Sequence, residues 1–80
     1  SMDEQAKQAF QCFVNAAELA DAADDMGSYP QLAECYENGI GVDVADGVEA
    51  FKFYRKALKL GYRKAESKVR ALEKKLRAEA

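Results

Sequence analysis

The side chains that could do chemistry in this 80-residue chain are few, and none is arranged as in a catalytic site. There is no histidine, so the chain lacks the commonest general base and proton shuttle and the imidazole ligand of metal sites. The neighbouring carboxylates, Asp24-Asp25 and Asp43/Asp46, fall at expected helix ends or in a loop, where helix capping accounts for them. No acidic residues alternate through a twelve-residue loop that ends in glutamate, as an EF-hand requires. We therefore expect no enzyme activity, no cofactor and no metal site.

The two cysteines, Cys12 and Cys35, are too few for a zinc site. Both lie among apolar residues at helical spacing, where a free cysteine behaves as a small hydrophobic side chain. We expect two buried thiols in a reducing compartment, and hence a cytoplasmic protein. The sequence leaves open a single disulfide between them.

The segment Gly39-Ile40-Gly41-Val42 contains the Gly-x-Gly spacing found in some phosphate-binding turns. No strand precedes it, and no third glycine or lysine follows in register, so nucleotide binding is disfavoured. We expect instead an ordered loop with positive φ at its glycines, and with Ile40 and Val42 turned inward.

Charge is divided unevenly along the chain, although the net charge is only −2. Residues 1–50 contain eleven Asp or Glu and one Lys, whereas residues 51–80 contain eleven Lys or Arg and three Glu. The favoured interpretation is that the two halves face each other or simply keep the protein in solution. The alternative is steering of a charged partner or head-to-tail association.

Basic residues concentrate in the C-terminal segment, which raises the possibility of nucleic-acid binding. They are Arg63, Lys64, Lys68, Arg70, Lys74, Lys75 and Arg77. Glutamates are interspersed among them, and Tyr62 is the one aromatic residue available there for stacking on bases. A solvated helix is therefore the favoured interpretation, and a nucleic-acid interface is the less favoured alternative.

Hydrophobic periodicity predicts an all-α chain of about four antiparallel helices, at residues 3–25, 30–38, 46–60 and 63–78. Ser1-Met2 resembles the remnant of a cleaved tag, and residues 3–80 form one domain. Apolar residues of the first helix recur at three- and four-residue steps, namely Ala6, Ala9, Phe10, Phe13, Ala16, Ala17 and Ala20. Asp3 is its expected N-cap, and Asp21, Asp24 and Asp25 are expected to weaken its C-terminal end. No apolar run approaches the length of a bilayer-spanning helix.

Local signals mark the boundaries of the later helices. Pro30 suits the first turn of the second helix, and Asn38-Gly39 suits a left-handed end. Asp46 and Glu49 have the spacing of a capping box at the start of the third helix, and Gly61 ends it.

The fourth helix has a single narrow apolar stripe at Ala65, Val69, Leu72 and Leu76. Its other faces are charged, and the pairs Glu66–Arg70 and Glu73–Arg77 have the spacing of i,i+4 ion pairs. We interpret it as a C-terminal cap that closes the core against water.

An offset of 41 residues aligns Ala9, Phe10, Phe13, Ala16 and Leu19 with Ala50, Phe51, Tyr54, Ala57 and Leu60. A two-helix period of this length is typical of helical repeats. The constrained positions are Leu32, Ala33, Tyr36, Gly39, Gly41, Val42, Asp46, Ala50, Phe53, Tyr54, Lys56, Ala57, Leu58, Gly61 and Ala65. This pattern resembles the Sel-one-like repeat, a branch of the tetratricopeptide superfamily. The resemblance implies a right-handed α-solenoid, and the long link from Ala20 to Leu32 leaves the register of the first junction open.

The resemblance implies a non-enzymatic protein–protein interaction scaffold, the C-terminal part of a larger protein. In that family the shorter helix of each pair lines the concave side, which places Gln31, Glu34 and Glu37 toward a bound partner. An acidic groove predicts a basic or mixed-charge peptide as partner, with neither a small-molecule substrate nor a membrane involved. The alternative is a structural cap or self-association module, in a protein that is a monomer or associates weakly with itself.

Overall fold

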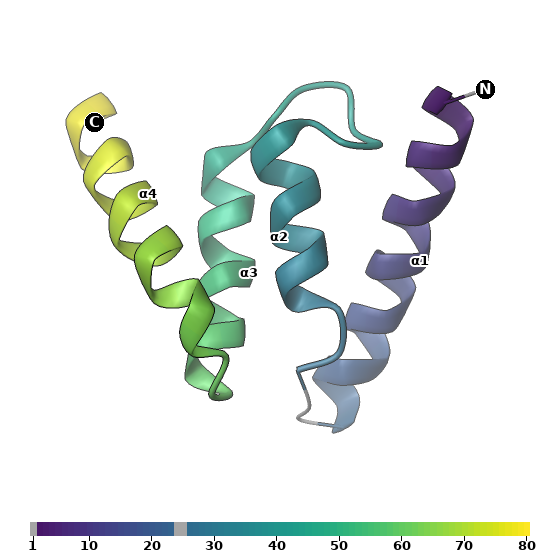
Figure 1. Ribbon diagram of the computed structural model, residues 1–80, viewed down its shortest axis with the longest axis horizontal. Helices are drawn as coiled ribbons and strands as arrows, with labels where there is room; N and C mark the ends of the chain where they lie inside the picture. Colours follow the sequence, from purple (N-terminus) through teal and green to yellow (C-terminus); the bar gives the residue numbers. More distant parts are fainter. Residues whose placement is uncertain (1, 24–25) are drawn as a thin grey trace.

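A computed structural model describes residues 2–23 and 26–80, and it confirms the all-α prediction. The helices are α1 (Met2–Ala23), α2 (Tyr29–Asn38), α3 (Gly47–Lys59) and α4 (Glu66–Glu79), with a 3-10 turn, η1 (Arg63–Ala65), before α4. They lie side by side in chain order with alternating direction, so the two termini lie at opposite ends of the row (Figure 1). This is the arrangement of a helical-repeat array.

The two ends of α1 differ in how far the prediction holds. The helix begins at Met2, so Asp3 lies within the first turn instead of capping it, where its charge still favours the helix dipole. The helix ends at Ala23. The predicted weakening of its C-terminal end by Asp24 and Asp25 concerns residues outside the described ones.

The predicted start of the fourth helix at residue 63 is corrected, because residues 63–65 form the tighter turn η1.

Local signals at the ends of α2 and α3 are largely confirmed. Gly39 has a φ of 71° and ends α2 in the left-handed conformation. The Asp46 carboxylate accepts hydrogen bonds from the backbone N–H groups of Val48 (3.0 Å) and Glu49 (3.1 Å). The reciprocal half of the capping box does not form, because the Asp46 N–H donates to the Tyr36 carbonyl at 2.7 Å. Glu49 instead accepts from Lys52 at 3.0 Å. The cap therefore also ties the start of α3 to α2.

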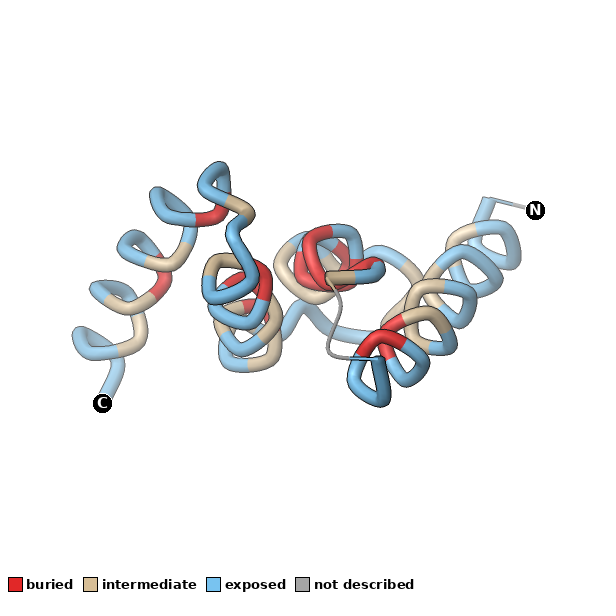
Figure 2. The backbone as a smooth tube through the Cα atoms, turned by 90° about the horizontal axis from the view of Figure 1, so that it is seen from below, coloured by how far each residue is buried: buried red, intermediate tan, exposed pale blue. Residues whose placement is uncertain are grey.

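The core lies where α2 meets α3, and small residues form its centre. Buried segments concentrate on the facing sides of these two helices (Figure 2). Ala33, Ala50 and Ala57 are fully buried, and Leu32 and Tyr54 are nearly so. Alanine at these crossings lets the two backbones approach closely, so a larger side chain there would force them apart.

Aromatic rings extend this core toward α1. The Tyr36 and Phe53 rings stack with centroids 5.8 Å apart, and Tyr29 stacks on Phe53 at 5.9 Å. Phe10 of α1 meets the Tyr36 ring edge-on at 5.4 Å. These contacts attach α1 to the α2–α3 pair through aromatic packing.

Burial on α1 differs from the sequence prediction. Ala17 and Ala20 are buried against α2, but Ala9 and Cys12 are exposed. The predicted burial of Cys12 is therefore wrong, while that of Cys35 is confirmed, and both thiols are free. The reason is that α1 has α2 and α3 on one side only, and no helix of the described residues covers its opposite face.

The loop after α2 packs closely on α1. Gly41 has a φ of 73°, and a Cβ on it would lie 2.4 Å from the Ala6 carbonyl oxygen, so this position requires glycine. Val42 is half-buried as predicted, but Ile40 is exposed, contrary to the prediction. The backbone of the glycine turn makes the close contact, and this leaves the Ile40 side chain outside it.

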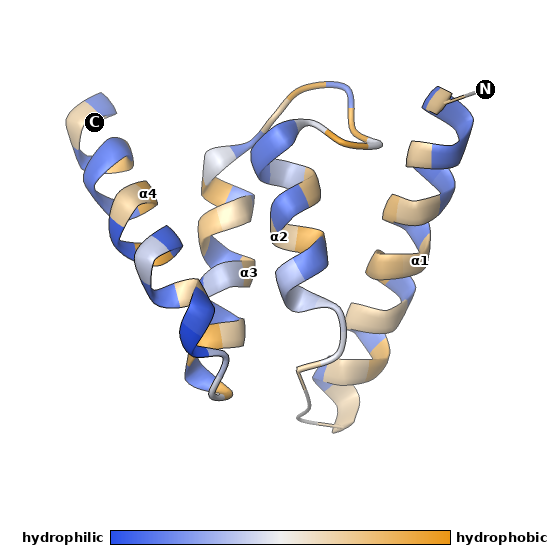
Figure 3. Ribbon diagram, in the orientation of Figure 1, coloured by the Kyte–Doolittle hydropathy of each residue, from blue (hydrophilic) through white to orange (hydrophobic). Residues whose placement is uncertain are grey.

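The surface of α4 is hydrophilic over most of its length, as Figure 3 shows. Its predicted apolar stripe is confirmed, because Ala65 and Leu72 are buried and Val69 and Leu76 are half-buried. Both predicted ion pairs form, Arg70 with Glu66 and Arg77 with Glu73, each at 2.9 Å. Exposed pairs of this kind each stabilise a helix by only about 0.3–0.5 kcal/mol.

Candidate interaction groove

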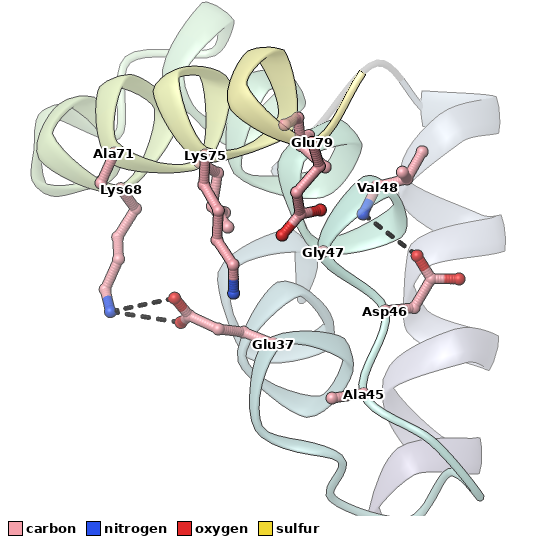
Figure 4. A pocket seen from close by; sticks show the side chains of 11 residues that line it. Glu37, Ala45, Asp46, Gly47, Val48, Lys68, Ala71, Lys75 and Glu79 are labelled. Carbon is pink, nitrogen blue, oxygen red and sulfur yellow. Dashed lines mark hydrogen bonds and ion pairs between the residues drawn. The ribbon is translucent and has the colours of Figure 1, made fainter.

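A groove of about 500 Å³ lies between the C-terminal end of α2, the start of α3 and one face of α4 (Figure 4). Leu72 and Leu76 of α4 give it an apolar base, and exposed Val48 lies at its edge. Charged side chains of both signs surround this base. They are Glu37, Asp46, Lys68, Lys75 and Glu79.

Glu37 is the fixed polar group of the groove. Its Oε1 accepts a hydrogen bond from the Tyr54 hydroxyl at 2.8 Å. Its two oxygens also accept from the Lys68 ammonium at 3.2 and 3.3 Å (Figure 4). Burial, together with the hydrogen bond to Glu37, raises the pKa of the Tyr54 hydroxyl above its ordinary value, so it stays protonated as the donor. Glu37 thus links α2, α3 and α4.

Lys75 and Glu79 differ from Glu37, because their charged groups form no ion pair with another described residue. Both side chains extend from α4 into the groove (Figure 4). The groove therefore offers one cation and one anion, beside apolar contacts from Leu72 and Leu76. Such a surface suits a mixed-charge peptide better than a single ion.

The residues predicted to contact a partner divide into two sets. Glu37 lines the groove, whereas Gln31 and Glu34 are exposed on α2 outside its lining. Sequence reasoning missed Val48, Leu76 and Glu79 as groove residues, because Leu76 and Glu79 come near Val48 only when α4 packs against α3. The available signal was the 41-residue period, which aligns α3 with α1. The helix after α3 is therefore expected to pack on α3 as α2 packs on α1.

The basic residues of the C-terminal segment do not form one continuous patch. Lys68 and Lys75 line the groove, and Lys68 is paired with Glu37. The remaining ones border two shallow depressions that also contain glutamates: Arg63, Lys64, Arg70, Lys74 and Arg77. Of these, Arg70 and Arg77 are already paired with glutamates, so the surface has a mixed charge that suits phosphate binding poorly.

A second polar cluster fixes the end of α1 against α2 and α3. The Tyr29 hydroxyl donates a hydrogen bond to Asp21, and the Lys56 ammonium lies 3.3 Å from the same carboxylate. Lys56 also lies over the Tyr29 and Phe53 rings, 5.3 and 5.5 Å from their centroids. The hydrogen bond from Tyr29, aided by Lys56, lowers the pKa of Asp21. These contacts account for the cluster as a structural link between three helices.

Two further features bear on the class of site. Among residues 2–23 and 26–80, no group of three or more acidic residues or cysteines is placed to hold a metal ion. Within the same residues, no helix has both the length and the apolar character to cross a membrane.

Comparison with protein families gives a specific match. The model of the Sel1 repeat matches residues 2–21 and 22–62, and the second match has the length of the 41-residue offset found within the sequence. No curated protein and no solved structure matches the chain. Sel1 repeats generally mediate protein–protein interactions. Together with the helix arrangement, the match shows that this chain belongs to the Sel1 repeat family.

Proposed function

We propose that the chain is a non-catalytic scaffold module that binds a mixed-charge peptide segment of another protein in the groove between α2 and α4. The observation that carries this proposal is the combination in one groove of an apolar base with two charges, Lys75 and Glu79, that form no ion pair with another described residue. The general role of Sel1 repeats supports it.

The chemistry of the groove defines the expected ligand. An apolar side chain of the peptide would contact Leu72, Leu76 and Val48, with neighbouring carboxylate and ammonium groups facing Lys75 and Glu79. Charge at the rim would set specificity and association rate more than affinity. Glu37 would lie beside the bound peptide without pairing with its charges, because Tyr54 and Lys68 already occupy its oxygens.

Gln31 and Glu34 would extend the contact along α2 beyond the groove. A longer peptide with a basic end would reach Glu34, which is exposed. Glu34→Lys is a cleaner test of this extension than a change at Glu37, because Glu37 holds three helices together.

NMR titration of the isotope-labelled chain with mixed-charge, basic and acidic peptides tests the proposal. We expect mixed-charge peptides to shift the resonances of Val48, Leu72 and Lys75. The charge exchange Lys75→Glu with Glu79→Lys preserves net charge and should weaken binding about tenfold, or about 1.4 kcal/mol. Lys64→Glu, outside the groove, is the control. Shifts centred elsewhere, or equal binding by the exchanged variant, would contradict the proposal.

A further inference from the structure

The ion pair between Lys68 and Glu37 crosses the groove from α4 to α2. The Lys68 ammonium lies 3.2 Å from Oε1 and 3.3 Å from Oε2 of Glu37 (Figure 4). Because α4 packs mainly on α3, this contact is not a by-product of close packing between α4 and α2. The pair therefore occupies space in which a ligand would lie.

Glu37 is a carboxylate already oriented to bind a cation. The Tyr54 hydroxyl holds its Oε1 from the side of the core at 2.8 Å. The Oε2 oxygen accepts from Lys68, and no other residue of the described chain donates to it. Without the Lys68 ammonium, Oε2 would be available to an ammonium or guanidinium group of a ligand.

Lys68 is a cation that the fold itself supplies to this carboxylate. Its side chain is 50% exposed, so the pair is accessible from solvent and open to competition by another cation. Because Lys68 belongs to the same chain, it faces Glu37 at a higher effective concentration than a dissolved peptide reaches. A basic peptide must therefore displace Lys68 before it can use Glu37.

The other charged groups of the groove are placed differently. Asp46 caps α3, while Lys75 and Glu79 form no ion pair with another described residue. With Lys68 charged, three carboxylates share the groove with two ammonium groups. Loss of the Lys68 charge would leave three carboxylates beside one ammonium and release Glu37 among them, which favours a cationic ligand.

We propose that Lys68 is the specificity-determining residue of this groove. By pairing with Glu37, it disfavours purely basic peptides and leaves Lys75 and Glu79 to select a mixed-charge one. This inference rests on the proposed function, because it concerns which peptides the same groove accepts. A neutral residue at position 68 would convert the groove into one that prefers basic peptides.

NMR titration of the whole chain with two peptides tests this role. Each peptide has one leucine, flanked by lysines in the basic peptide and by one lysine and one glutamate in the mixed-charge peptide. Lys68→Gln should bind the basic peptide at least about fivefold more tightly than the wild type does, and the mixed-charge peptide within about twofold of it. Lys68→Arg keeps the cation and should retain the wild-type preference. Circular dichroism should show unchanged helicity in both variants.

Two further variants separate release of Glu37 from a general change of charge. Lys75→Gln is the matched control, since it removes the same charge from the same helix and groove but leaves the pair between Lys68 and Glu37 intact. Its affinity for the basic peptide should rise by less than about twofold. Adding Glu37→Gln to Lys68→Gln should cancel the gain, because the released carboxylate is then absent.

Three results would overturn the role of Lys68. They are no gain with Lys68→Gln, as when Lys75 takes over Glu37, an equal gain with Lys75→Gln, and a gain that survives Glu37→Gln. Failure of the mixed-charge peptide to bind the wild type would instead contradict the proposed function. The basic peptide and the Lys68 variants would still decide whether Lys68 keeps Glu37 from binding a ligand.

Discussion

The outer face of α1 and the α2-facing side of α3 carry corresponding residues in opposite environments. Ala50 and Ala57 are fully buried between α3 and α2, while Ala9 is exposed and Ala16 only half-buried on α1. Both helices carry two alanines seven residues apart at these corresponding positions. The difference comes from the neighbour, since α3 lies between α2 and α4, whereas no helix of the described residues packs on the outer face of α1. A repeat sequence thus specifies a packing surface, and the adjoining helix decides whether that surface is core.

A larger side chain should produce the strongest contrast between the two faces. Ala50→Leu is expected to destabilise the chain by about 1–3 kcal/mol, because the α2–α3 crossing has no room for it. The matched variant Ala9→Leu should change stability by less than about 0.5 kcal/mol in dilute solution. Urea denaturation followed by circular dichroism measures both. Equal losses would show that the two faces are packed alike.

Substitutions at the starts of α3 and α1 should differ less in their effect on stability. Asp46→Ala should cost about 1 kcal/mol, because it removes the side-chain acceptor for the Val48 and Glu49 N–H groups. With the same offset, its counterpart on α1 is Gln5, which lies inside the helix. Gln5→Ala should therefore be neutral, as the same denaturation experiment would show. A neutral Asp46→Ala would mean that the link to Tyr36 alone fixes the start of α3.

Acid titration should detect the contact that holds the end of α1 to the α2–α3 pair. The hydrogen bond from Tyr29 and the nearby Lys56 lower the pKa of Asp21. A carboxylate with a lowered pKa stabilises the folded state above its unfolded pKa, and this contribution is lost as the pH falls below about 4. Thermal melts from pH 6 to pH 3 should show a smaller acid-induced loss for Asp21→Asn than for the wild type. Glu18→Gln is the control on the same helix, and identical slopes in all three proteins would contradict this contribution.

Features that depend on local sequence were predictable. The left-handed end at Gly39, the cap at Asp46 and the ion pair Glu66–Arg70 were confirmed, because residues within four positions of one another form each of them. The helix-pair fold followed from the 41-residue period and the glycine turn.

Features that depend on distant neighbours were not predictable in the same way. Cys12 has the spacing of a buried residue, yet no described helix covers it. Glu37 was expected to face a partner, but its carboxylate is held by Tyr54 and by Lys68, 31 residues away. The groove was missed for the same reason, since it forms between α2 and α4, which are separated by all of α3.

Thiol reactivity tests the contrast between the two faces most directly, since each cysteine reports on one environment. In dilute native protein, Cys12 on the open face of α1 should react rapidly with a thiol-specific reagent. Cys35, buried on α2, should react only when the chain unfolds. One fast thiol in the native state and two in urea is the predicted result. Two fast thiols, or none, would contradict the assignment of α2–α3 as the core and of the outer face of α1 as uncovered.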